Sequence, residues 1–198
     1  MKCFSQKHRI RDTFLALCVT LLTVNGCNNP FATGTPEPPR GGLVNYPQPT
    51  SLENVLEILS LALQAEDNPA YLERLSESFR FVPDAVQLAS PAFRNFPAEW
   101  TGDHEEMFLA GLLSNADSVF VTWENILALP AGETSTATAD YELTVITLTG
   151  GRTEYRGRVE ITARQTAGVW TIETWRDVLV SGYENTWGLL RAMLLAAG

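Results

Sequence analysis

The chain has 198 residues and a formal net charge of −9, from 14 Lys and Arg against 23 Asp and Glu. This length suits one domain with a substantial hydrophobic core. The acidic balance argues against a nucleic-acid partner, because binding to phosphates requires a basic surface.

The N-terminus has the layout of a bacterial lipoprotein signal. The basic residues 1–12 precede the apolar residues 13–24, a run too short to span a bilayer but typical of a signal peptide. Residues 24–27 (VNGC) resemble the lipobox of bacterial lipoproteins, although Asn25 stands where a small residue is usual. We therefore expect cleavage before Cys27 and acylation of this cysteine, palmitate included. The alternative is an ordinary signal peptide with an incidental cysteine.

Cleavage at this point removes the signal peptide, residues 1–26, and leaves few reactive side chains. Cys27 is then the only cysteine and His104 the only histidine, and both lysines are lost. An intramolecular disulfide, a zinc site of Cys and His ligands, a lysine Schiff base and a P-loop lysine are therefore excluded. We expect neither a metal nor a cofactor.

The segment that follows has the composition of a tether. Residues 28–49 are rich in Pro and Gly and show no apolar periodicity, so they cannot bury a core. We expect residues 27–49 to be a lipidated cysteine with a disordered tether, and residues 50–198 to be the folded domain. The alternative is a loop that packs on the domain, although structureless loops of this length are uncommon.

The first half of the domain is predicted to be largely helical. Residues 50–53 (TSLE) have the sequence of a capping box, and Leu and Val then recur at helical spacing to about Glu66. Asp67, followed by Asn and Pro, predicts the start of a second helix. Asp103, with Glu106 three residues later, predicts the start of a third.

Three further segments lie between or after these helices. A short strand is expected at residues 79–82, where Pro83 ends it. Residues 83–99 contain three prolines and are expected to be mostly irregular. Residues 186–197 predict an amphipathic helix at the end of the chain.

From Asp117 onward the apolar period changes to two, which predicts long antiparallel strands. Gly150-Gly151 and Ala167-Gly168 predict tight turns between them. Over residues 152–164, charged side chains fall on one face and apolar ones on the other, typical of a half-buried strand with a solvated charge ladder. Residues 169–180 are expected to form the last strand.

This order of elements resembles the nuclear transport factor 2-like superfamily over about residues 50–180. The match is carried by the opening helix pair (residues 52–72), the strand at residues 78–81 and the last strand at residues 170–177. Residues 186–191 (TWGLLR) resemble the tail of bacterial lipoproteins that carry this domain. The resemblance implies an α+β cone, in which a curved antiparallel sheet wraps around N-terminal helices and encloses a pocket.

Six aromatic residues are candidates to line that pocket, since binding pockets are mostly apolar. They are Tyr71, Phe81, Trp100, Trp123, Tyr141 and Trp175. Core packing explains the same residues equally well, because a cone of this size must be filled.

Two ionisable residues are candidates for catalysis. Asp177 shares a strand face with Glu173 and Trp175, and two carboxylates inside an apolar cone would raise each other's pKa. If that face points outward, both are solvated and Trp170 lies inward instead. His104 is the second candidate, although an exposed position in an acidic first helical turn is the simpler interpretation.

Two functions remain open. One is a membrane-anchored, non-catalytic module that binds a ligand or protein on the periplasmic face or the cell exterior. The other is a small hydrolase, isomerase or dehydratase that uses a carboxylate in the cone. The resemblance implies this because some members of the superfamily are enzymes, such as ketosteroid isomerase, scytalone dehydratase and limonene epoxide hydrolase, although many members only bind ligands or proteins. A cone filled by side chains favours the first function and leaves the outer sheet face as the interface.

Location and partners follow from the same features. The expected location is the bacterial cell envelope, with the membrane reached through the lipid anchor. Asn28, which is not Asp, favours the outer membrane by resemblance to proteobacterial lipoproteins. The expected partner is a small apolar ligand or an envelope protein. The resemblance also implies a homodimer through the sheet, for which Trp170 and Ile172 are candidate contacts.

Overall fold

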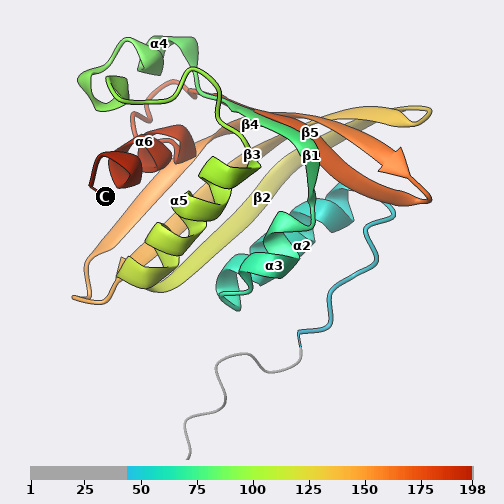
Figure 1. Cartoon of the computed structure of the whole chain (residues 1–198), viewed down its shortest axis with the longest axis horizontal. Helices are drawn as coiled ribbons and strands as arrows, with labels where there is room; N and C mark the ends of the chain where they lie inside the picture. Colours follow the sequence, from blue (N-terminus) through green and yellow to red (C-terminus); the bar gives the residue numbers. More distant parts are fainter. Residues whose placement is uncertain (1–43, 198) are drawn as a thin grey trace, which may run out of the picture. The chain divides into compact units, whose positions relative to one another are not determined.

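The computed structural model describes residues 44–197, so the expected signal peptide, Cys27 and most of the expected tether lie outside the described residues. The described part combines one five-stranded sheet with helices, which confirms the expected α+β class (Figure 1). The elements in chain order are α2 (Leu52–Gln64), α3 (Asn68–Leu72), β1 (Leu75–Val82), α4 (Ala85–Leu88), η1 (Pro91–Phe93), α5 (Gly102–Asn115), β2 (Ala116–Ala131), β3 (Thr134–Thr147), β4 (Arg152–Thr166), β5 (Val169–Val178) and α6 (Trp187–Ala197).

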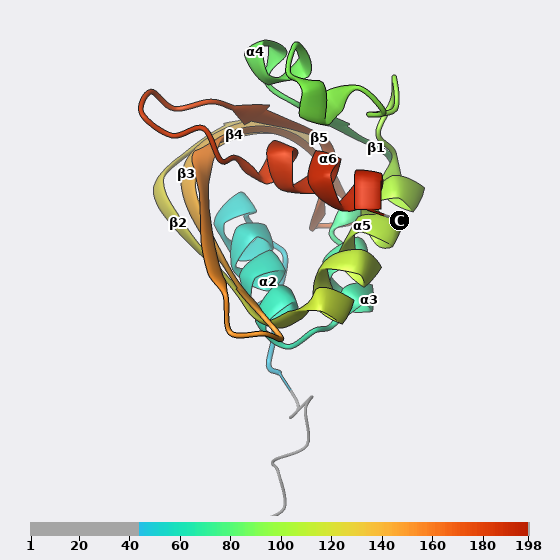
Figure 2. The same cartoon turned by 90° about the vertical axis from the view of Figure 1, so that its left-hand side faces the viewer.

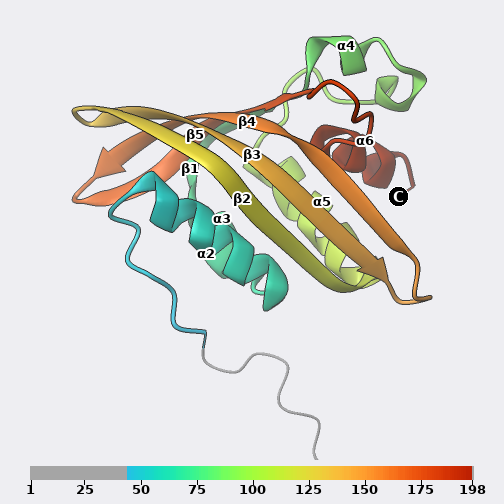
Figure 3. The same cartoon turned by 180° about the vertical axis from the view of Figure 1, so that it is seen from behind.

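The sheet is strongly curved, and α2, α5 and α6 face its concave side (Figure 2). The strand order is β1-β5-β4-β3-β2, with the long strands β2, β3 and β4 running side by side (Figure 3). These strands and β5 pair antiparallel, but β1 pairs parallel with β5. The sheet is therefore mixed, where a wholly antiparallel one was expected.

The starts of two helices differ from the expected caps. Ser51, rather than Thr50, caps α2: its backbone is extended and its hydroxyl accepts from the backbone N–H of Asn54 at 3.2 Å. Thr101, rather than Asp103, caps α5, because the helix already begins at Gly102. The cap expected at the second helix is confirmed, since the Asp67 carboxylate accepts from a backbone N–H of α3.

The segment expected to be irregular, residues 83–99, contains the short helices α4 and η1. Its polar side chains hold the loop that leads to α6. One oxygen of Asp84 caps α4 and the other accepts from the backbone N–H of Leu179 at 3.1 Å. Gln87 donates to the carbonyl of Glu184 at 2.9 Å and accepts from the hydroxyl of Thr186 at 2.6 Å. This segment therefore helps to position α6.

Strand β5 carries a β-bulge that decides which of its side chains face the core. Ile172 pairs with Ala163 and Thr174 with Thr162, which leaves Glu173 without a partner in the ladder. The extra residue shifts the alternation by one position. Ile172 and Trp175 consequently both point inward and are both 0% exposed.

This bulge corrects two expectations about the last strand. The sequence left open whether Trp170 or Trp175 points inward, and in the structure both do, together with Asp177. Glu173 does not share the face of Asp177; it forms an ion pair with Arg164 on the outer side of the sheet. Trp170 and Ile172 are buried, so they are not available for a dimer contact.

The domain begins before Thr50. The hydroxyl of Tyr46 donates to the Asp67 carboxylate at 2.8 Å, and Tyr46 also packs against the hydrophobic core. Burial and this hydrogen bond raise the pKa of Tyr46 to about 12. The carbonyl of Pro49 accepts from the backbone N–H of Trp170 at 2.9 Å. The last residues of the expected tether are thus part of the folded unit.

A chain that begins at Tyr46 is therefore expected to melt within about 1 °C of the chain that begins at Cys27. A chain that begins at Thr50 loses the packing of Tyr46 on the core and the hydrogen bonds that Tyr46, Gln48 and Pro49 make to the rest of the domain. Its Tm should therefore fall by about 2–8 °C. Thermal unfolding by circular dichroism measures both. Equal melting temperatures for all three chains would contradict the role of residues 46–49.

Candidate functional site

The six aromatic residues expected to line a pocket lie in one core cluster. Five of them are buried, and Trp123 is half-buried against the same cluster. Trp187 of α6 occupies the space between three of them. The centroid of one Trp187 ring lies 5.0 Å from that of Trp175, 5.6 Å from that of Tyr141 and 6.0 Å from that of Trp123. The helix α6 therefore fills this part of the cone.

A buried ion pair joins α6 to α5. Arg191 donates to both carboxylate oxygens of Glu105, at 2.6 and 2.9 Å, and both side chains are 0% exposed. The same carboxylate accepts from the Tyr71 hydroxyl at 3.1 Å and from Nε1 of Trp100 at 2.7 Å. The charge of Glu105 is thus matched by one cation and two neutral donors, as a buried charge requires.

Aromatic rings surround the guanidinium of Arg191. Its Cζ lies 4.1 Å from the ring centroid of Phe81, 5.0 Å from that of Phe108, and 5.3 Å from those of Trp175 and Trp187. These distances are within the range of cation–π attraction. Arg191 is therefore held in the core by one carboxylate and a box of rings.

The second buried carboxylate, Asp177, receives the N-terminus of α6. It accepts from the Tyr141 hydroxyl at 2.7 Å and from the backbone N–H of Gly188 at 2.6 Å. Tyr141 in turn accepts from the backbone N–H of Trp187 at 2.8 Å. A carboxylate at this position matches the positive end of the helix dipole.

Glycine makes room for this arrangement at two positions. A Cβ at Gly157 of β4 would lie 2.5 Å from the hydroxyl oxygen of Tyr141, which pairs with it across the strands. A Cβ at Gly188 would lie 2.9 Å from an oxygen of Asp177. Side chains at either position would therefore displace the groups that hold α6.

Burial changes the proton affinity of these groups. Desolvation raises the pKa of Asp177, and this effect exceeds the opposing effect of its hydrogen bonds from Tyr141 and Gly188. Desolvation, and then the nearby carboxylates, raise the pKa values of Tyr71 and Tyr141 well above that of a free tyrosine. Both tyrosines are therefore neutral donors at physiological pH.

The raised pKa of Asp177 predicts a pH dependence of stability. The folded state binds the proton more tightly than the unfolded state, whose pKa is near 3.8. The contribution of Asp177 to the free energy of unfolding is therefore greatest below that pH and falls as the pH rises through the folded pKa.

Denaturant unfolding of the wild type and of Asp177→Asn across this pH range measures the effect. The wild type should lose stability relative to the variant as the pH increases from about 3.8. A difference that stays constant, or that grows in favour of the wild type, would contradict the raised pKa.

His104 is placed apart from these carboxylate networks as a capping residue. Its Nδ1 accepts from the backbone N–H of Thr101 at 3.2 Å, and its ring lies 5.6 Å from that of Trp100 between centroids. The interpretation as a helix-start residue agrees with this position. The side chain is half-buried against Trp100 rather than fully exposed.

Three residues of the site were missed in the sequence. Glu105 looked like one more acidic residue in a first helical turn, and Trp187 and Arg191 looked like parts of a terminal helix. The available signal was the surroundings of Arg191: a lone charge in the otherwise apolar run of residues 187–197. A charge in such a run predicts a buried partner.

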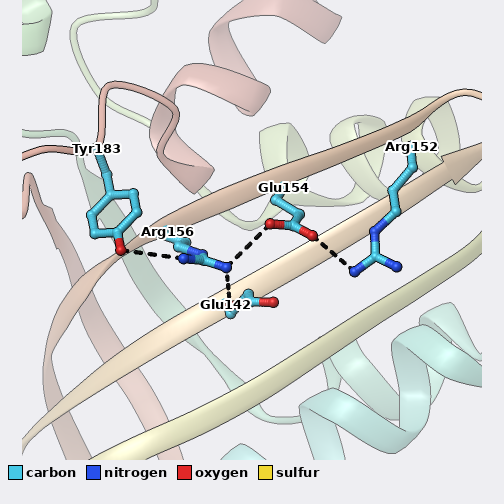
Figure 4. Close-up of polar contacts among 5 residues, drawn as sticks. All are labelled: Glu142, Arg152, Glu154, Arg156 and Tyr183. Atoms are coloured by element: carbon cyan, nitrogen blue, oxygen red, sulfur yellow. Dashed lines mark hydrogen bonds and ion pairs between the residues drawn. The ribbon is translucent and has the colours of Figure 1, made fainter.

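The outer face of the sheet carries the expected charge ladder, confirmed as a solvated face. Arg156 of β4 pairs with Glu142 of β3 at 2.7 Å and with Glu154 at 3.1 Å (Figure 4). The same guanidinium donates to the Tyr183 hydroxyl at 3.2 Å, and its Cζ lies 5.2 Å from the centroid of the Tyr183 ring. Arg158 pairs with Asp140 in the same way. A shallow groove of about 220 Å³ lies along this ladder.

Within residues 44–197 no helix is both long and apolar enough to cross a bilayer. In the same part of the chain no three His, Cys, Asp or Glu side chains are gathered in an arrangement that suits a metal ion. A second groove, of about 320 Å³, lies where Tyr46–Pro49 meet α2 and α3.

No protein-family model matches this chain, and a search of curated proteins finds no relative. Solved structures do match. A candidate aromatic-ring hydroxylase from Novosphingobium aromaticivorans is similar with a TM-score of 0.57 at 14% identity, over 70% of this chain and 93% of that chain. A candidate scytalone dehydratase from the same organism has a TM-score of 0.55 at 12% identity, over 69% and 91%. Protein Kfla4162 from Kribbella flavida has a TM-score of 0.55 at 12% identity, over 71% and 94%.

At these identities the likeness concerns the fold alone. The neighbours are cone folds in which a curved sheet is closed by helices, as the order of elements in the sequence predicted. The domain of this chain has the nuclear transport factor 2-like fold.

Proposed function

We propose that this protein is a lipid-anchored, non-catalytic binding module of the bacterial cell envelope. The absence of catalysis is proposed from the hydrogen bonding of the two buried carboxylates. Every oxygen of Asp177 and Glu105 accepts at least one hydrogen bond from the protein itself. A general acid or base must instead reach the substrate, and α6 occupies the space in which a substrate would lie.

Because α6 fills the cone in this structure, we place the binding of a partner protein on the outside of the domain. The outer sheet face offers a ladder of charged side chains with a groove at Tyr183, Arg156 and Glu142. Polar surfaces with Arg and Tyr are typical of protein interfaces. We therefore propose an envelope protein as the partner on this face, and the lipid at Cys27 as the link to the membrane.

The anchor is tested by replacing the cysteine. Cys27→Ala should release the domain from the membrane fraction or leave it unprocessed, because the lipid is the proposed attachment. Fractionation with incorporation of labelled palmitate measures this. Native mass spectrometry of the extracted wild type should show the lipid mass on the chain. Normal cleavage with unchanged membrane retention would contradict the anchor.

A small hydrolase, isomerase or dehydratase is the second candidate. One observation favours it: Asp177, with a raised pKa, and Tyr141 lie 2.7 Å apart inside the cone. Such a pair suits acid–base chemistry if α6 moves away. The two candidates differ in one measurement, since only an enzyme would lose turnover in Asp177→Asn while keeping its membrane attachment.

A further inference from the structure

We propose that the cone contains a binding site for a guanidinium-type organic cation, which the Arg191 side chain of α6 occupies in this structure. The use of this site in the cell rests on the proposed binding function. Its existence rests on the geometry of the cone, which is formed almost wholly by residues outside α6.

The anionic part of the site is held by other elements. Glu105 belongs to α5, and its oxygens are oriented by the Tyr71 hydroxyl of α3 at 3.1 Å and by Nε1 of Trp100 at 2.7 Å. Neither contact involves α6. The carboxylate would therefore keep its position and its two free acceptor directions when Arg191 is absent, and a fixed carboxylate favours a bidentate planar cation.

The walls of the site are aromatic and also come from elsewhere in the fold. Phe81 lies on β1, Phe108 on α5 and Trp175 on β5, with their ring centroids 4.1, 5.0 and 5.3 Å from the Cζ of Arg191. Trp187 is the only wall from α6. Rings around a carboxylate suit a planar, weakly hydrated cation better than a compact ammonium.

The present occupant is carried by a single helix, α6. A loop joins α6 to β5, and residues 181–185 of this loop are exposed. Docking of α6 also leaves three buried donors without a partner among residues 44–197: Nη1 of Arg191 and Nε1 of Trp175 and of Trp187. Buried donors without an acceptor cost free energy, so they lower the stability of the docked helix and make its Arg191 easier to displace from Glu105.

The test removes the occupant and supplies its head group. The full-length variant Arg191→Ala keeps Glu105 and the three walls. Ethylguanidinium should raise its Tm saturably, by about 5–10 °C at roughly 100 times the Kd. Ethylammonium, which has the same charge without the planar fork, should give less than a third of this rise. Neither cation should raise the Tm of the wild type, and Glu105→Gln/Arg191→Ala should lose the response.

The guanidinium group that fills this site can belong to a free small molecule or to an arginine of another chain. A peptide distinguishes these two sources. A synthetic peptide of residues 184–198 should stabilise Arg191→Ala if the source is a helix such as α6 of a second copy. The peptide with Arg191→Gln should not. A response to ethylguanidinium without a response to the peptide assigns the site to a small molecule.

The remaining outcomes overturn the site. They are equal responses to ethylguanidinium and ethylammonium, a response that persists without Glu105, and no response to cation or peptide. If Arg191→Ala is unfolded in the absence of ligand, the titration is followed by near-UV circular dichroism, which measures folding induced by the ligand. A variant that folds with neither ethylguanidinium nor the peptide also overturns the proposed site. Loss of membrane attachment or a measured turnover would contradict the proposed function and leave the cation response unchanged.

Discussion

Replacing Glu105 by Ala is expected to lower the free energy of unfolding by about 3–5 kcal/mol, the usual cost of breaking a buried ion pair. The substitution leaves Arg191 as an unpaired charge whose side chain is 0% exposed. It also removes the acceptor of the Tyr71 hydroxyl and of Nε1 of Trp100. Denaturant unfolding followed by tryptophan fluorescence measures the loss.

The adjacent residue provides a matched control. Glu106 lies in the same helix but is exposed, so Glu106→Ala should change the free energy of unfolding by less than about 0.5 kcal/mol. Replacing both partners, Glu105→Gln with Arg191→Met, should recover most of the loss, because a buried ion pair often stabilises no more than apolar packing does. Losses of similar size for Glu105→Ala and Glu106→Ala would contradict the buried pair.

Trp175→Ala is expected to cost about 3–5 kcal/mol, because a large ring in the centre of the core is lost and a cavity remains. Trp175 is 0% exposed and contacts Trp123, Trp187 and the guanidinium of Arg191. Trp170→Ala should be of similar severity, since the bulge at Glu173 turns both rings inward. Equilibrium unfolding in urea measures both values.

Two milder variants calibrate this expectation. Val169→Ala, on the same strand but 39% exposed, should cost no more than about 1 kcal/mol. His104→Ala removes a capping acceptor and should cost about 0.5–2 kcal/mol. If Trp175→Ala were near neutral while Trp170→Ala were severe, the inward position of Trp175 would be wrong.

The cone fold could be predicted from the sequence because its signals are local. Helical spacing in residues 52–63 and the period of two from Asp117 each report on neighbours along the chain. The positive φ angles of Ala167 and Gly168 likewise follow from a two-residue turn between strands. Patterns of this kind fix which elements form and, in a strand without a bulge, which face is buried.

The contents of the cone were decided by tertiary structure. Glu105 and Arg191 lie 86 positions apart. The apolar run around Arg191 predicts a buried partner, but nothing local in the sequence identifies Glu105 as that partner. The bulge at Glu173 arises where β4 and β5 are brought into register, and it overrides the alternation that the sequence shows.

By itself, therefore, the sequence determined the longer helices and strands of this protein, their order, and the apolar face of each of them except the last strand. Only the tertiary structure decided that α6 fills the cone and that Asp177 faces inward without Glu173. It also decided that Arg191, the one charged residue of the terminal helix, forms a buried ion pair with Glu105. The physical reason is that periodicity records burial along one element, whereas the partner of a buried polar group is set by the packing of elements distant in the chain.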